Sequence, residues 1–213
     1  MTKITTLIFD LGGVILNLDQ ERTFRAFMNL GAKLEEINKE SALFNEFETG
    51  KVDAETFRSY FLEVLKHQVS KQQVDDAWNA MLLDLPTHRV ELLKKMRKRF
   101  RIFLLSNTNS IHIDSFNKYL TQYHSGLDWM GLFDKVYYSY EIGHRKPDRT
   151  IYEHVLNDQG LTAGECIFID DSKPNLSGAR EAGLHVVWAK KPLDDEMVEE
   201  INALVASFRV SMN

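Results

Sequence analysis

The sequence contains a single cysteine and no excess of basic charge, and both shortages restrict what the protein can be. Cys166 lies in an apolar run and cannot form an internal disulfide, so we expect a buried structural thiol and a reducing, cytoplasmic compartment. The formal net charge is -5, and the basic residues are spread along the chain. This distribution provides no cationic patch for a nucleic-acid backbone, so we expect no nucleic-acid partner.

Long hydrophobic runs are also absent. No uncharged apolar stretch approaches the roughly 18 to 20 residues that a membrane-spanning helix needs. The N-terminal apolar stretch is interrupted by Asp10 without a small-residue cleavage site after it, so we expect neither export nor a membrane partner. No coiled-coil heptad is present, and we expect a monomer. With 213 residues, of which 44% are hydrophobic, the chain can bury one large core or a core with an insertion.

Short apolar runs of strand length recur along the chain. They lie at residues 4–9, 101–105, 165–169 and 185–189, with a weaker run at 135–139. The runs are continuous rather than alternating, which indicates strands that are covered on both faces. Because helical patterns separate them, we expect a doubly wound, Rossmann-like α/β core with a parallel sheet and right-handed crossovers.

Residues 17–84 interrupt this alternation because they contain no convincing strand. Apolar residues at helical spacing follow the capping candidates Asp53 and Ser70. We expect about four helices that form a small bundle, inserted directly after the first strand. The α/β core then comprises residues 1–16 and 85–213, and the bundle lies beside the end of the first strand.

Polar, reactive side chains follow four of the expected strands. Ligands bind an open parallel sheet at the carboxyl ends of its strands, so these side chains are site candidates. Adjacent carboxylates repel each other unless a cation or hydrogen-bond donors neutralise them. Three carboxylates at one edge suit Mg²⁺, and a hydroxyl, an amide and an ammonium group opposite them suit a phosphate group. The candidates are Asp10, Ser106, Asn107, Lys146, Asp170 and Asp171.

The ordered segments FDLGGVI, LLSNTN, RKPD and IFIDDSKPN resemble the four motifs of the haloacid dehalogenase superfamily, over essentially the whole chain. The helical insertion resembles the small helical cap of that superfamily. Within it, the chain is most similar to bacterial sugar-phosphate phosphatases of the glucose 1-phosphate phosphatase type. The resemblance implies Mg²⁺-dependent hydrolysis of a small phosphorylated metabolite through an aspartyl-phosphate intermediate.

The resemblance also implies a role for each candidate. Asp10 is then the nucleophile and a metal ligand, and Gly12 offers its backbone carbonyl to the Mg²⁺ ion. Asp171 is the main acidic metal ligand of the fourth motif, with Asp170 beside it and Asn175 supporting the loop. The phosphoryl oxygens and the charge on the phosphate are then held by Ser106, Asn107 and Lys146.

Gly12 departs from the superfamily pattern, in which a second aspartate at this position usually protonates the leaving oxygen. The loss of a general acid typically lowers the rate by roughly 10²-fold to 10⁴-fold. Three interpretations remain: a phosphatase for esters with good leaving groups, a 2-haloacid dehalogenase, and a non-catalytic relative that binds a phosphorylated metabolite. The acidic pair of the fourth motif counts against the dehalogenase.

Other side chains have weaker predictions. Asp19, His144 and residues of the helical insertion are candidates to supply the missing proton. Arg22, Glu46 and Glu48 are candidates to contact the substrate, depending on how their helices are rotated. The aromatic residues of the insertion occur at helical spacing, so we expect them to form its core rather than a pocket.

Overall fold

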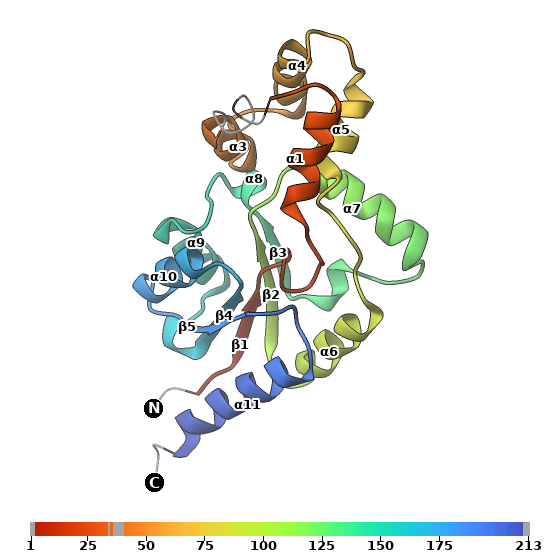
Figure 1. Cartoon of the computed structure of the whole chain (residues 1–213). Coiled ribbons are helices and arrows are strands. Elements are labelled where there is room, and N and C mark those ends of the chain that lie inside the picture. The colour runs from red at the N-terminus through yellow and green to blue at the C-terminus, as the bar shows by residue number, and fades with distance from the viewer. Residues whose placement is uncertain (1–2, 34, 36–40, 211–213) are drawn as a thin grey trace.

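A five-stranded parallel sheet forms the centre of the protein (Figure 1), as a computed structural model describes it for residues 3–33, 35 and 41–210. The strand order is β3-β2-β1-β4-β5. The register places Phe9 level with Leu104 and Ile169, so three strands end at one edge of the sheet. The predicted strands are thus confirmed, as β1 (Thr6–Phe9), β2 (Arg101–Ser106), β3 (Lys135–Tyr138), β4 (Cys166–Asp170) and β5 (His185–Trp188).

Helices cover both faces of the sheet, which confirms the doubly wound architecture. Ile8 and Phe168 face α9 (Arg149–Gln159) and α10 (Lys173–Glu181) in one apolar cluster. Leu7 and Phe9 face the opposite cluster, with α6 (Thr87–Arg97), α7 (Ser110–Tyr123) and α11 (Asp195–Val210). Figure 1 shows α9 and α10 on one side and α6 and α7 on the other. The shorter helices are η1 (Met130–Leu132), α8 (Ser139–Ile142) and η2 (Ala163–Glu165).

Each strand is a continuous apolar run in the sequence, because its alternate residues are buried in the two apolar clusters on opposite faces of the sheet. Cys166 is one of these residues. It is 0% exposed in the cluster with α9 and α10, as expected of a structural thiol.

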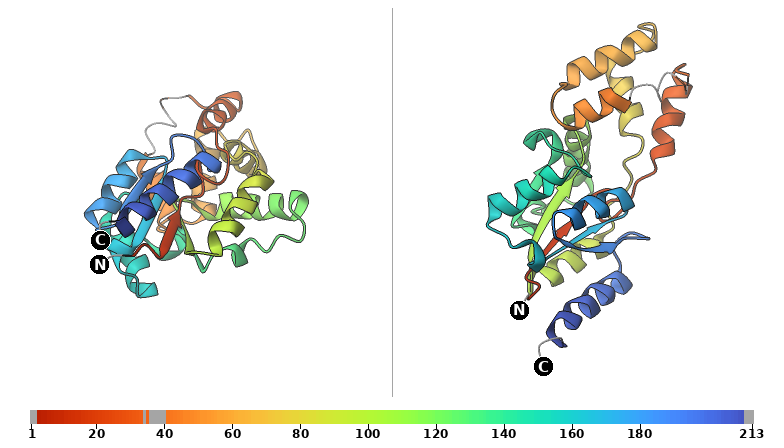
Figure 2. Two further views of the ribbon diagram at one scale, coloured as in Figure 1. Left: turned by 90° about the horizontal axis from the view of Figure 1, so that it is seen from below. Right: turned by 90° about the vertical axis from the view of Figure 1, so that its left-hand side faces the viewer.

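The inserted helices pack on one another at the carboxyl end of the sheet (Figures 1 and 2). They are α1 (Gln20–Asn29), α3 (Ser41–Glu48), α4 (Ala54–Val64) and α5 (Lys71–Asn79). Asp53 and Ser70 cap α4 and α5 as predicted, each accepting a hydrogen bond from a backbone N–H. Phe27, Phe57 and Phe61 are 0% exposed, so aromatic residues form the core of this bundle. The exact boundaries of the insertion, 17 and 84, stay a prediction.

Two short segments connect the bundle to the sheet and pair with each other. Asn17 and Asp84 are joined by a backbone hydrogen bond of 3.0 Å, and Leu18 forms an antiparallel bridge with Leu82. The buried Arg89 donates to the backbone oxygen of Ile15, at 2.9 Å, and to the side chain of Asn17, at 2.8 Å. These bonds hold the entry and exit of the bundle together beside the end of β1.

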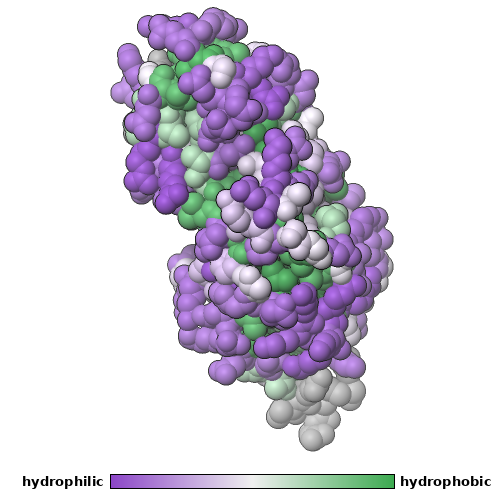
Figure 3. Space-filling view, turned by 90° about the vertical axis from the view of Figure 1, so that its right-hand side faces the viewer, coloured by the Kyte–Doolittle hydropathy of each residue, from purple (hydrophilic) through white to green (hydrophobic). Residues whose placement is uncertain are grey.

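The face of the molecule in Figure 3 is mainly hydrophilic, with apolar side chains in scattered patches. The large exposed apolar side chains of the described residues, Met28, Tyr123, Met130 and Trp188, lie on separate elements or loops. Among residues 3–33, 35 and 41–210, no helix is both long and apolar enough to cross a membrane.

Candidate active site

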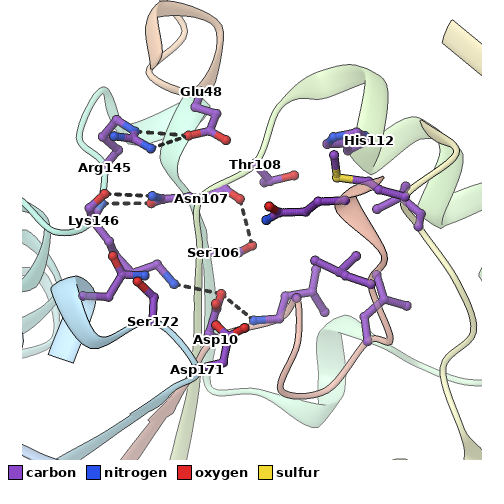
Figure 4. Close-up of a pocket in the computed structure, with 18 of the residues that line it drawn as sticks. Asp10, Glu48, Ser106, Asn107, Thr108, His112, Arg145, Lys146, Asp171 and Ser172 are labelled. Atoms are coloured by element: carbon purple, nitrogen blue, oxygen red, sulfur yellow. Dashed lines mark hydrogen bonds and ion pairs between the residues drawn. The ribbon is translucent and has the colours of Figure 1, made fainter. Parts of the chain in front are cut away.

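A cavity of about 430 Å³ lies between the carboxyl ends of the strands and the helical bundle (Figure 4). The strand ends and the loops after them contribute Asp10, Ser106, Asn107, Lys146 and Asp171. The topology therefore brings together residues that lie up to 161 positions apart in the chain. The bundle side of the cavity includes Glu48, Trp78 and Met81.

Lys146 lies between two buried carboxylates. Its Nζ atom is 2.8 Å from Asp10 Oδ1 and 2.8 Å from Asp170 Oδ2, and the lysine side chain is 1% exposed. Asp10 Oδ1 also accepts a hydrogen bond of 2.7 Å from the backbone N–H of Leu11. A buried charge is tolerated only when it is paired and hydrogen-bonded, and these contacts meet that requirement.

The electrostatics of this group follow from burial and pairing. Burial raises the pKa of the Asp10 carboxyl group, and the nearby Lys146 charge only partly opposes the rise. Burial alone would lower the pKa of Lys146, but Asp10 and Asp170 outweigh it and the pKa is raised. Lys146 therefore stays protonated, and an additional cation beside Asp10 would favour its carboxylate form.

The acidic side chains fit a divalent cation. Asp10, Asp170 and Asp171 each offer one carboxylate oxygen, and these oxygens lie within 4.8 Å of one another. A Cβ atom built on Gly13 would come within 2.4 Å of Asp171 Oδ2, so only glycine leaves room for this carboxylate. Such a set of oxygen ligands suits Mg²⁺.

Asp170 and Asp171 differ in their surroundings although they are adjacent. Besides Lys146, Asp170 accepts hydrogen bonds from the backbone N–H of Ser172, at 2.7 Å, and from Asn175 Nδ2, at 3.1 Å to each oxygen. Asp171 is exposed and lines the cavity. Asp170 therefore organises Lys146 and the loop after β4, whereas Asp171 presents its carboxylate to a ligand.

Ser106 ends β2 and Asn107 follows it, but their side chains face different partners. The hydroxyl group of Ser106 makes a single long contact, 3.5 Å to the backbone oxygen of Asn107, among the described residues, and so can bind a phosphoryl oxygen. Asn107 uses both polar side-chain atoms on the backbone of Lys146, donating to its carbonyl and accepting from its N–H, each at 2.8 Å. Asn107 thus positions Lys146, a role that its place beside Ser106 in the sequence did not reveal.

The side chain of Leu18 lies beside Gly12. A Cβ atom built on Gly12 would lie 2.4 Å from Leu18 Cδ1, the end of a flexible side chain, so a larger residue at position 12 would require Leu18 to move. Of the two proton-donor candidates that were named individually, Asp19 pairs with Arg22 and Arg25, and His144 lines a different cavity. Neither is among the described residues that line the active-site cavity.

Several cavity residues were missed at the sequence level, among them Arg145 and His112. Arg145 directly precedes Lys146 in the RKPD motif, which is the signal that could have found it. His112 of α7 stacks on Trp78 of α5, with ring centroids 5.0 Å apart, and its Nδ1 atom lies 2.9 Å from Asn79 Oδ1. Burial lowers the pKa of His112 to about 3, so the ring is neutral near pH 7.

This burial predicts a pH dependence of folding. Between pH 6.5 and about 3, the ordinary and the lowered pKa of His112, the unfolded chain binds a proton that the folded chain does not. The neutral, buried His112 ring therefore makes its full contribution to the free energy of unfolding above pH 6.5, and this contribution is lost as the pH falls towards 3. From pH 7 to 5 we expect this residue to lower the free energy of unfolding by about 2 kcal/mol.

Urea unfolding at both pH values tests this expectation in the wild type and in His112→Gln, which lacks the titrating ring. The exposed His88 on α6 provides the matched control, His88→Gln. The same change in unfolding free energy in His112→Gln as in the wild type would contradict the expectation.

Comparisons with known proteins agree with this geometry. The family model of the haloacid dehalogenase-like hydrolases matches residues 4–183. A D-ribitol-5-phosphate phosphatase from Bacteroides thetaiotaomicron is 28% identical over 204 residues, which cover 90% of this chain and 94% of that protein. A HAD family enzyme from the same organism, solved with magnesium and inorganic phosphate, is 36% identical with a TM-score of 0.84, and the match covers 92% of this chain and 98% of that one.

A more distant structure shares only the fold. A 2-haloacid dehalogenase from Pseudomonas syringae is 18% identical with a TM-score of 0.60, and the match covers 87% of this chain and 86% of that one. The predicted superfamily, the hydrolase class and the α/β architecture are confirmed by the family match together with the sheet topology. The chain belongs to the haloacid dehalogenase-like hydrolase family.

Proposed function

We propose that the protein is a Mg²⁺-dependent phosphatase that hydrolyses a small sugar phosphate or polyol phosphate through an aspartyl-phosphate on Asp10. The observation that carries the proposal is the pairing of Asp10 with the buried Lys146 at 2.8 Å, beside the open carboxylate of Asp171. The similarity to a D-ribitol-5-phosphate phosphatase and to an enzyme solved with magnesium and phosphate supports it.

Each side chain has a defined part in the proposed reaction. Asp10 forms a bond to phosphorus while the ester P–O bond breaks, and the departing oxygen takes a proton from water. A water molecule then attacks the aspartyl-phosphate and gives a proton to the hydroxide left by the first step, which releases inorganic phosphate and restores the carboxylate. Lys146 and the Ser106 hydroxyl hold the phosphoryl oxygens, and Asn107 keeps Lys146 in place.

Mg²⁺ would be held by Asp10, Asp171 and the backbone carbonyl of Gly12, with Asp170 beside them, and would supply positive charge to the phosphoryl group. The acidic cluster favours this reaction over dehalogenation. A dehalogenase needs no metal ion, and without one the carboxylate of Asp171 would have no cation beside it. The retention of Asp10, Ser106 and Lys146 in one cavity likewise favours catalysis over binding alone.

Removal of the metal should abolish this activity. Without Mg²⁺ the carboxylates repel a phosphate dianion, so we expect phosphate release to fall by more than about 10³-fold when EDTA is added. The measurement is inorganic phosphate released from a panel of sugar, polyol, acyl and aryl phosphates. Added excess Mg²⁺ restores the rate, whereas Ca²⁺, with its larger coordination shell, should restore less of it.

Full phosphate release in the presence of EDTA would refute the metal-dependent mechanism. Release of halide from a 2-haloacid under the same conditions would support the dehalogenase instead. Saturable binding of phosphate esters without turnover of any ester would support the non-catalytic alternative.

A further inference from the structure

An ion pair between the bundle and the core lies in the wall of the active-site cavity. Glu48 is the last residue of α3, and Arg145 precedes Lys146. Glu48 Oε2 lies 2.9 Å from Arg145 Nη2 and 3.1 Å from Arg145 Nε, and both residues line the cavity. Figure 4 shows the pair at the end of the cavity away from Asp10 and Asp171.

The pair has unused hydrogen-bonding capacity. Both contacts from Arg145 go to Oε2, so Glu48 Oε1 accepts no hydrogen bond from the described residues, and Arg145 Nη1 likewise donates none to them. The side chains are partly buried, with exposed fractions of 23% for Glu48 and 28% for Arg145. Burial raises the pKa of Glu48, and the Arg145 charge partly opposes this rise. One strong acceptor and several donors therefore remain beside the cavity.

The Glu48–Arg145 pair suits the hydroxyl groups of a substrate rather than its phosphoryl group. A carboxylate repels a phosphate dianion, so Glu48 does not suit the phosphoryl group, which belongs at the Lys146 end. An ionised carboxylate does accept strong hydrogen bonds from hydroxyl groups, and a guanidinium group donates to hydroxyl oxygens. Adjacent hydroxyl groups, each both donor and acceptor, match both halves of the ion pair.

The structure also separates Glu48 from the other charged candidates of the bundle. Arg22 pairs with Asp19 and is not among the described lining residues, and Glu46 lines a second cavity of about 460 Å³ with His144. Arg145 lines both cavities, so the ion pair forms part of the partition between them. The rotation of α3 thus directs one carboxylate to the active site and the other away from it.

We propose that Glu48 and Arg145 recognise the hydroxyl groups of a polyhydroxylated leaving group and determine specificity for sugar or polyol phosphates over esters without hydroxyl groups. This inference rests on the proposed phosphatase function and names the residues that recognise the leaving group. It predicts that the pair acts on substrate choice, whereas Asp10 and Lys146 act on every phosphate ester.

The test compares two esters with the same phosphoryl group, D-ribitol 5-phosphate and p-nitrophenyl phosphate. In Glu48→Gln we expect the ratio of kcat/KM for the polyol ester to that for the aryl ester to fall about tenfold or more. We also expect KM for the polyol ester to rise several times more than the inhibition constant of inorganic phosphate. Glu46→Gln, on the same helix but facing the second cavity, is the matched control and should keep the wild-type ratio.

The outcomes separate recognition from a merely structural contact. Equal losses for both esters in Glu48→Gln, or an unchanged ratio, would show that the pair only joins α3 to the core and would overturn the inference. If Glu48→Gln does not fold in a thermal unfolding measurement, Arg145→Lys keeps the positive charge with fewer donors and should lower the same ratio.

The wild-type protein distinguishes this inference from the function on which it rests. Hydrolysis of the aryl ester but of no sugar or polyol phosphate would leave the proposed phosphatase mechanism intact and refute both hydroxyl recognition and the proposed substrate class. Hydrolysis of neither ester with Mg²⁺ present would refute the phosphatase proposal and the inference together.

Discussion

Replacement of Asp10 by asparagine is expected to lower phosphate release by at least about 10⁴-fold, because the amide cannot form the aspartyl-phosphate. The variant should nevertheless fold. Burial raises the pKa of Asp10, so its charge is costly in the folded state, and Lys146 keeps its second partner, Asp170, at 2.8 Å. We therefore expect a thermal unfolding temperature no lower than that of the wild type.

The measurement is the initial rate with saturating Mg²⁺ for wild type and Asp10→Asn, together with thermal unfolding. Asp19→Asn provides the control, since this nearby aspartate pairs with arginines and is not among the described lining residues of the cavity. Undiminished turnover by Asp10→Asn would refute the covalent mechanism.

Replacement of Lys146 by methionine is expected to impair both stability and activity. The substitution leaves Asp10 and Asp170 buried without their shared cation, and an unpaired buried charge typically lowers the free energy of unfolding by about 3–5 kcal/mol. Loss of the charge that faces the phosphoryl group should lower kcat by roughly 10³-fold. Mg²⁺ should restore part of the stability, since it also neutralises these carboxylates.

Urea unfolding with and without Mg²⁺ measures this effect. The control is Lys94→Met, which removes an exposed lysine that pairs with Glu91 on the surface of α6, and surface pairs contribute at most about 1 kcal/mol. If Lys146→Met were as stable as the wild type without metal, the two carboxylates would not depend on Lys146, and its proposed role would be wrong.

The sheet and its polar edge could be predicted because both depend on local patterns. Continuous apolar runs indicate buried parallel strands, and parallel strands in register end at one edge. The polar residues after those runs, such as Asp10 and Asp171, were therefore expected together, and the structure places them together. The caps at Asp53 and Ser70 were predictable for the same reason, since a cap involves residues a few positions apart.

The partners of the side chains were not predictable in this way. Asn107 is adjacent to Ser106, yet its amide group binds the backbone of Lys146, 39 residues away. Leu18 fills the space beside Gly12 because the two connecting segments pair there. A pattern of residue types contains no information on such rotamers and packing.

Hydrophobic periodicity and strand register were therefore enough to predict the α/β sheet, the inserted helices and the residues at the strand ends. Three features were visible only in the folded molecule: which carboxylate of α3 faces the cavity, the contact of Glu48 with Arg145 across 97 residues, and the stacking of His112 on Trp78. These contacts depend on the rotation of helices against the sheet, and that rotation is set by the packing of the whole molecule rather than by any local segment.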